Sequence, residues 1–166
     1  MTKLVLVRHG QSVWNKENRF TGFNDVDLSE QGKEEAMNAS ELLLSNNIKI
    51  DIAFTSKLKR AINTCKIIVN NQVENNKLLD LVSKSLNINE DSALNERDYG
   101  DLTGKNKDEI KAEHGEEQLH KWRRSFNERP PNGENLSDVC SRVSNYYNQN
   151  IKQHLQDKNV LIAAHG

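Results

Sequence analysis

Two histidines in the chain follow short apolar segments that are candidates for parallel strands of one sheet. Residues 4–7 (Leu-Val-Leu-Val) run into Arg8-His9-Gly10, and residues 160–164 (Val-Leu-Ile-Ala-Ala) run into His165-Gly166. Open α/β sheets bind ligands at the carboxyl ends of their strands, so we expect both histidines in one crevice. A single histidine in such a place is more often an ordinary loop residue, whereas a pair beside an arginine suits phosphate chemistry. The guanidinium holds the anion, and a neutral imidazole can attack phosphorus.

The wider pattern around the first histidine, Leu-Val-Arg-His-Gly-Gln-Ser-Val-Trp-Asn over residues 6–15, resembles the histidine phosphatase superfamily, whose signature is Arg-His-Gly. Further segments are similar to one branch of it, the 2,3-bisphosphoglycerate-dependent phosphoglycerate mutases, over residues 18–22, 25–29, 55–61, 94–100, 121–124 and 163–166. The resemblance covers residues 1 to about 70 and about 94 to 126, and it resumes in the last helix and strand. The stretch 71–93 shows no such resemblance.

The resemblance implies an α/β fold, three-layer αβα with a mainly parallel sheet, as in phosphoglycerate mutases. It implies a single phosphoglycerate mutase-like domain over residues 1–166 that is incomplete, because similar mutases continue past the second His-Gly with an asparagine that helps to bind the phosphate. We therefore expect a C-terminally truncated chain of poor activity or none, since a free carboxylate beside His165 would repel a dianionic ligand.

The implied activity is the interconversion of 3-phosphoglycerate and 2-phosphoglycerate in glycolysis and gluconeogenesis. It runs through a phosphohistidine intermediate that 2,3-bisphosphoglycerate primes. His9 matches the phosphorylated nucleophile, and neighbouring arginines keep an imidazole neutral by lowering its pKa. Arg8, Arg60 and His165 match the phosphate pocket, whose donors stabilise the transferring group. Glu96 matches the general acid and base, which takes a proton from the substrate hydroxyl and returns one.

The family's substrate contacts match two further groups of residues. Ser12, Asn15, Thr21 and Gly22 lie after the first strand, although Ser12 and Asn15 could equally be turn residues with local backbone bonds. The family's residues that bind the substrate's carboxylate and second phosphate match Tyr99, Lys107, Arg123 and Arg124. The expected substrate-binding residues also include Gly166. The alternative interpretation is that Arg123 and Arg124 lie on a solvated face of a helix and bind no substrate.

Two departures from the mutase pattern keep other functions open. Gln11 replaces a glutamate that is common in mutases, and residues 127–136 hold a short Pro-Pro turn where long mutases have a charged lid. A lid excludes water and so protects a phosphohistidine from hydrolysis. The alternatives are therefore a broad-specificity histidine phosphatase, or an inactive truncated remnant that keeps the site for binding only.

Composition narrows the classes of partner. Lysine and arginine number 23 and aspartate and glutamate 24, so the net charge of −1 gives no case for nucleic acid or a membrane surface. No apolar run reaches the ~20 residues of a membrane span, and we expect a cytoplasmic protein with Cys65 and Cys140 as buried, reduced thiols. No two histidines are spaced i, i+4, so no metal is expected. The expected partner is a small phosphorylated substrate, and a homo-oligomer stays open.

The hydrophobic periodicity alternates strands with helices, as in α/β sheets. We expect strands at 3–7 and 48–54 and near 79–82, and a final strand before His165. We expect helices at 30–45 after the cap Ser29, from Thr55 or Ser56 to 70–72, over 107–126 with a break near Gly115, and, as the longest, over 136–151. Residues 130–133 form a turn.

Overall fold

Four parallel strands form the sheet in residues 1–77 and 86–166, the part of the chain that the computed structural model describes. They are β1 (Leu4–Arg8), β2 (Ile52–Thr55), β3 (Ile88–Glu90) and β4 (Val160–Ala164), in the spatial order β1-β4-β2-β3. All neighbouring pairs are parallel, and Arg8 stands opposite Ala164 in the β1–β4 pair. The last strand of the sheet therefore lies between the first two.

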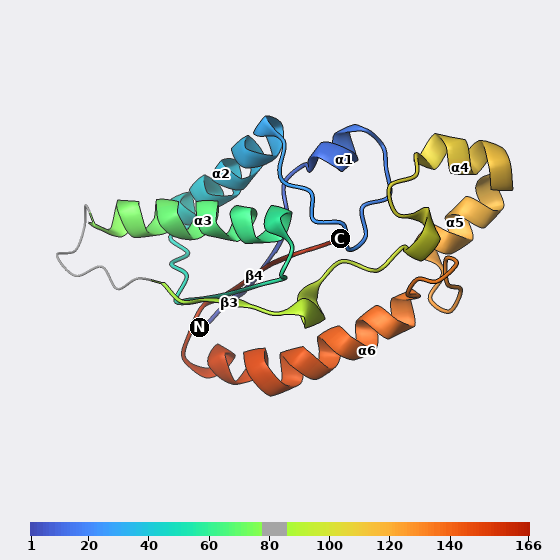
Figure 1. Ribbon diagram of the computed structural model, residues 1–166. Helices are drawn as coiled ribbons and strands as arrows, with labels where there is room; N and C mark the ends of the chain where they lie inside the picture. The colour runs from blue at the N-terminus through green and yellow to red at the C-terminus, as the bar shows by residue number, and fades with distance from the viewer. Residues whose placement is uncertain (78–85) are drawn as a thin grey trace.

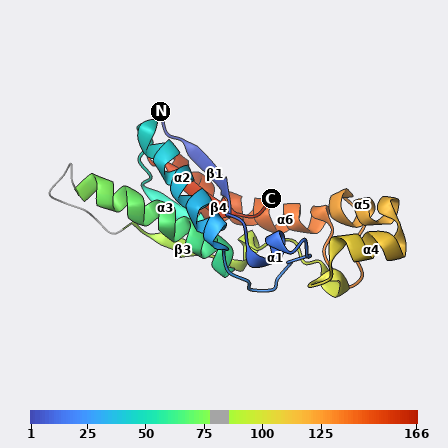
Figure 2. The ribbon, with the colours of Figure 1, turned by 90° about the horizontal axis from the view of Figure 1, so that it is seen from above.

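The helices cover both faces of this sheet, which confirms the expected three-layer αβα fold. Figure 1 shows α2 (Glu30–Ser45) and α3 (Lys59–Lys77) on one face and α6 (Leu136–Tyr146) on the other. The short helix α1 (Val13–Lys16) follows β1, and α4 (Lys107–His114) and α5 (Glu116–Arg124) lie together beyond the end of the sheet (Figure 2). Short helical turns occupy η1 (Ser92–Leu94), η2 (Gly100–Leu102), η3 (Tyr147–Ile151) and η4 (Lys152–Gln156).

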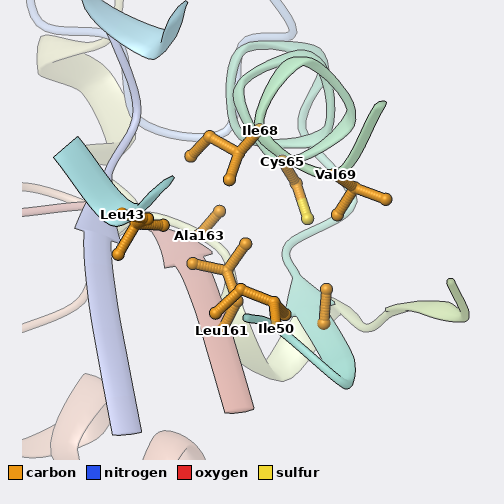
Figure 3. Packing of buried hydrophobic residues seen from close by; sticks show 8 residues of the cluster. Leu43, Ile50, Cys65, Ile68, Val69, Leu161 and Ala163 are labelled. Carbon is orange, nitrogen blue, oxygen red and sulfur yellow. The ribbon is translucent and has the colours of Figure 1, made fainter. Parts of the chain in front are cut away.

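Alternate residues of β4 face opposite layers, because successive side chains of a strand point to opposite faces. Leu161 and Ala163 pack with residues of α2 and α3, including Leu43 and Cys65, as Figure 3 shows. Val160 and Ile162 belong to a second cluster on the α6 side. Burial on both faces explains why the segment is apolar throughout.

Three local signals in the sequence are confirmed. The Ser29 side chain accepts a hydrogen bond from the Gly32 amide (3.1 Å) and so caps α2 at the expected residue. Gly115, with φ of +84°, separates α4 from α5, because this backbone conformation suits glycine and interrupts a helix. The expected turn also forms, since the Gly133 amide donates to the Pro130 carbonyl (3.0 Å).

The expected ends of the second strand and the helix after it are wrong. β2 begins only at Ile52, and α3 runs past residues 70–72 to Lys77. One buried side chain accounts for the late start of β2: Gln72 accepts from the Ile50 amide and donates to the Ile48 carbonyl, at 2.9 Å each. These bonds stabilise residues 48–50 outside the sheet ladder. The expected strand near 79–82 lies outside the described residues, and the sequence pattern does not predict β3.

The expected helix over residues 136–151 is confirmed in extent, but it changes type after Tyr146 and is not the longest helix. α6 ends at Tyr146, and a π-helical turn and a 3₁₀ turn continue the chain, so α3 is longer than α6. Cys65 is buried as expected, but Cys140 is exposed, because it lies on the side of α6 that faces an open cleft. In the described residues no helix is both long and apolar enough to cross a bilayer.

Candidate active site

The two His-Gly segments leave the sheet next to each other. The His9 amide donates to the Ala164 carbonyl (2.9 Å), which extends the β1–β4 pairing by one residue. The rings of His9 and His165 are 5.0 Å apart between centroids, edge to face. β1 and β4 are adjacent and parallel, and they end at the same level of the sheet. They thus bring together two histidines from distant parts of the sequence.

The loop after His9 is held against α2 and α3. A Cβ atom on Gly10 would lie 2.1 Å from the Gly32 carbonyl oxygen, so only glycine allows this approach of the first turn of α2. The Gly10 amide donates to the Thr64 hydroxyl (3.2 Å). Two helices therefore fix the backbone on which the His9 imidazole stands.

His9 has the properties of a neutral nucleophile. It is buried, and its Nδ1 lies 2.6 Å from the Gly10 carbonyl oxygen. A carbonyl only accepts, so Nδ1 carries the proton and Nε2 keeps its lone pair. Burial, and then the charges of Arg60 and Arg8, lower the pKa of His9 to about 4. The ring is therefore uncharged at neutral pH and can attack an electrophile.

His165 is arranged as a hydrogen-bond donor to a ligand. Its Nε2 lies 2.9 Å from the Ser56 hydroxyl, which itself accepts from the Leu58 amide (3.2 Å). The Glu96 carboxylate beside Nδ1 favours the imidazole proton on Nδ1, and the Ser56 hydroxyl then donates to Nε2. That buried Nδ1 has no hydrogen-bond partner in the described residues and lies 3.6 Å from Glu96 Oε2. Burial, followed by the charges of Arg60 and His9, lowers the pKa of His165 to about 2.

These two depressed pKa values predict an acid-sensitive fold. Below pH 6.5, the usual pKa of histidine, both histidines become protonated in the unfolded chain but stay neutral in the folded chain. The free energy of unfolding should therefore fall with falling pH, by about 1.4 kcal/mol per pH unit for each histidine. The His9 contribution stops changing below its folded pKa of about 4. Urea unfolding at several pH values, all above the range in which carboxylates titrate, measures how the free energy of unfolding depends on pH.

A variant separates this effect from general acid sensitivity. His165→Gln removes one of the two histidines that bind a proton only in the unfolded chain. It should therefore reduce the slope of the free energy of unfolding against pH by roughly half. His120→Gln, on the exposed surface of α5, is the matched control and should keep the full slope. An unchanged slope in His165→Gln would contradict the assignment.

Arg60 is a fully buried cation at the centre of the site. Its NH2 group donates to Glu96 Oε2 and to the Gly22 carbonyl (2.8 Å each), and NH1 donates to the Asn24 carbonyl (2.9 Å). Its Nε has no partner in the described residues. Buried charge is tolerated only when it is paired and hydrogen-bonded, so Glu96 and Arg60 hold each other in place.

One cleft of about 1240 Å³ is lined in part by His165. It has a polar end and an apolar end, the latter along β1 and α6. Most of the residues proposed from the sequence line the polar end: Arg8, Asn15, Thr21, Glu96, Tyr99, Lys107, Arg123, Arg124, His165 and Gly166. Burial and the nearby charge of Arg123 lower the pKa of Lys107, a sign of crowded cations. Such a surface favours an anionic ligand.

The remaining proposed residues do not line the cleft. His9 and Arg60 are buried behind it. The Ser12 side chain accepts from the Asn15 amide (3.2 Å) and caps α1, while the Asn15 side chain accepts from the Ser12 amide. Gly22 contributes its carbonyl to Arg60. The local turn interpretation thus describes the Ser12 side chain, whereas Asn15 both bonds locally and borders the cleft.

Sequence reasoning missed Ser56 and Arg97. Arg97 is buried, borders the cleft, donates to the Trp122 carbonyl and lies 4.7 Å from the Tyr99 ring centroid. Its NH1 has no partner in the described residues. The available signal was the position of Arg97 between two proposed site residues in Asn-Glu-Arg-Asp-Tyr. Ser56 could have been found only from its contact with His165.

His9, Glu96 and His165 each offer one possible metal-ligand atom, and these atoms lie within 4.8 Å of one another. Two imidazoles and a carboxylate are groups that bind divalent cations. Arg60 already donates to the Glu96 carboxylate, and the charges of Arg60 and Arg8 act on both histidines. These cations favour an anion at the same place.

Comparison with known proteins places the chain in a family. The sequence model of the histidine phosphatase superfamily (branch 1) matches residues 4–166. The chain is 52% identical over 165 residues to a 2,3-bisphosphoglycerate-dependent phosphoglycerate mutase of Mesorhizobium japonicum, and 50% identical over 164 residues to that of Brucella ovis. Each match covers 98% of this chain and 75% of the relative.

Solved structures resemble the fold closely. A protein described as mycobacterial hydrolase 1 has a TM-score of 0.82 at 26% identity, covering 100% of this chain and 74% of its own. A mycobacterial glucosyl-3-phosphoglycerate phosphatase in complex with VO3 has a TM-score of 0.79 at 27% identity, covering 100% and 77%. The strand-to-Arg-His-Gly geometry, the matched residues and these relatives agree, and the chain belongs to branch 1 of the histidine phosphatase superfamily.

Proposed function

We propose that the chain interconverts 3-phosphoglycerate and 2-phosphoglycerate through a phosphohistidine on His9, as a cytoplasmic step of glycolysis and gluconeogenesis. The observation that supports this most is a second cationic group, Lys107, Arg123 and Arg124, in the cleft that also reaches Arg8 and His165. A simple phosphatase needs one anion pocket, whereas a phosphoglycerate mutase must hold two anionic ends. The names of the Mesorhizobium and Brucella relatives support the same substrate.

The unpartnered donors of the site fit a phosphorylated ligand. Arg60 Nε, Arg97 NH1 and His165 Nδ1 are buried without a hydrogen-bond partner in the described residues, which is costly unless a ligand accepts from them. 2,3-Bisphosphoglycerate, when bound, supplies the phosphoryl group that primes the nucleophile. Arg8, with Arg60 and His165, is proposed to hold the oxygens of the transferring group.

Glu96 is proposed to move one proton in each half of the reaction. In the first half, the substrate hydroxyl attacks the phosphorus of phospho-His9, the P–N bond breaks, and the hydroxyl proton passes to Glu96. In the second half, neutral His9 Nε2 attacks the phosphorus at the neighbouring position. The P–O bond there breaks, and Glu96 returns its proton to the departing oxygen. His9 is phosphorylated again, and no proton is gained or lost over the cycle.

A broad-specificity phosphatase is the second candidate, and the turn at residues 130–133 favours it. The Pro131 carbonyl accepts from the Asp101 amide (2.9 Å), so the turn is bound to η2. Residues 127–135 are all described, and none of them borders the cleft. Without a covering lid, water reaches a phosphohistidine more easily. The mycobacterial relative that was solved with VO3 is likewise described as a phosphatase.

A product assay separates these candidates. The chain is incubated with 3-phosphoglycerate after priming with 2,3-bisphosphoglycerate, and both 2-phosphoglycerate and inorganic phosphate are measured. The proposal expects 2-phosphoglycerate to form faster than phosphate is released. Phosphate release without 2-phosphoglycerate would assign a phosphatase. Binding of the substrate without either product would indicate a chain that retains the site for binding only.

Arg123 and Arg124 are expected to select the substrate rather than to drive phosphoryl transfer. Replacing both with alanine should raise KM for phosphoglycerate far more than KM for a simple aryl phosphate. Each lost charged hydrogen bond is worth ~1.5–3 kcal/mol, or roughly 10- to 150-fold. Lys121→Ala, which removes a surface ion pair with Glu117 on the same helix, is the control. Equal losses on both substrates would show that the two arginines are not specificity residues.

A further inference from the structure

We infer that Arg142 and Glu134, which do not border the cleft, are positioning residues that hold the loop carrying Glu96 in place for proton transfer. The inference rests on the proposed role of Glu96 as acid and base. Arg142 lies on α6 and Glu134 just before it, whereas Glu96 lies between η1 and η2. The two segments meet through a dense set of hydrogen bonds.

Every nitrogen of the Arg142 guanidinium takes part. Its Nε and NH2 donate to the two carboxylate oxygens of Glu134 (2.9 Å each), a bidentate ion pair. NH1 donates to the carbonyls of Ala93 and Asn95 (2.8 Å each), and NH2 also donates to the carbonyl of Glu96 (2.9 Å). The planar fork of arginine allows this geometry, and the single ammonium of lysine does not.

Glu134 extends the contact to the other side of Glu96. Its Oε2 accepts from the Asp98 amide, and its own amide donates to the Asp98 carbonyl, at 2.9 Å each. Although burial opposes ionisation, the bonds from Arg142 and the Asp98 amide hold the pKa of Glu134 below its usual value. The backbone is thus fixed at Glu96 itself and two residues later.

This fixation matters because the chain from Asn95 to Asp98 has no regular secondary structure of its own. The Glu96 carboxylate must stay near Arg60 (2.8 Å) and His165 Nδ1 (3.6 Å) to reach the same ligand oxygen that they face. A displacement of about 1 Å at a reacting group can cost ~10²-fold in rate. Arg142 would therefore act on the reaction through Glu96 without touching the ligand.

The variant Arg142→Lys tests this, because it keeps the charge and removes the fork. Turnover of an alkyl phosphate, whose leaving oxygen needs a proton, should fall at least ~10-fold more than turnover of a nitrophenyl phosphate, whose leaving group departs as the anion. KM should change little for either ester. Arg129→Lys, which alters an exposed ion pair with Asp138 near the start of α6, is the matched control. Equal losses on both esters would overturn the inference.

A second readout does not depend on activity. Amide hydrogen exchange at Asp98 should accelerate at least ~10-fold in Arg142→Lys, while exchange at Phe54 in the sheet core stays unchanged. Unchanged exchange at Asp98 would show that Arg142 does not hold the loop. If 2,3-bisphosphoglycerate does not phosphorylate His9 in the unmodified chain, the proposed function fails, and the exchange measurement still decides whether Arg142 holds the loop.

Discussion

Replacing His9 with alanine is expected to abolish the phosphoryl adduct and to lower turnover by ~10³-fold or more, the scale of loss when a covalent nucleophile is removed. The expectation follows from the buried, neutral ring whose Nδ1 is bonded to the Gly10 carbonyl, which leaves Nε2 free to attack. Incubation of the unmodified chain with 2,3-bisphosphoglycerate should give an acid-labile, alkali-stable adduct that maps to His9 by peptide analysis.

His120→Ala serves as the control for this experiment, because His120 is exposed on α5. It should retain the adduct and the turnover in full. Persistence of an acid-labile adduct in His9→Ala would mean that another residue is the nucleophile, and His165 would be the first to test. Its ring lies 5.0 Å from that of His9, so a misassignment between the two histidines is the error that this experiment must detect.

Arg60→Ala is expected to produce the largest loss of stability, about 3–5 kcal/mol, which is typical when one partner of a buried ion pair is removed. The change leaves the Glu96 carboxylate without its cation and removes the donors of the Gly22 and Asn24 carbonyls. Urea unfolding at neutral pH measures the free energy of unfolding. Arg19→Ala, which removes an exposed ion pair with Glu17, should cost less than about 1 kcal/mol.

A double variant identifies the cause of that loss. If the uncompensated carboxylate is responsible, adding Glu96→Gln to Arg60→Ala should recover part of the free energy of unfolding. No recovery would attribute the loss to the carbonyls and to packing alone. A loss below about 1 kcal/mol in Arg60→Ala would contradict the description of Arg60 as the central buried cation of the site.

The sequence was most informative where a local rule applies. The apolar segments before His9 and His165 were predictable as strands because a short continuous apolar run favours a strand of a parallel sheet. β4 is buried on both faces, whereas β1 exposes Leu4 and Leu6. Ser29 caps α2 and Gly115 interrupts the helical region because capping and positive φ are local preferences. The adjacency of the two histidines followed from the topology rule for such sheets.

Features that depend on distant contacts were not predictable in this way. The start of β2 at Ile52 depends on Gln72 bonding across to residues 48–50, and no local pattern encodes that partner. Cys140 sits at an apolar helical position, yet its exposure is decided by what packs against α6. The role of Arg142 likewise appears only when α6 meets the Glu96 loop.

The strand order has a consequence for how the protein is made. β4 lies between β1 and β2, although both precede it by a long stretch of chain. During synthesis from the N-terminus, the edges of β1 and β2 that pair with β4 therefore stay unpaired until β4 has left the ribosome. The closure of so long a loop is slow relative to local folding. The anion pocket, which needs His165, therefore forms only after β4 has paired with β1 and β2.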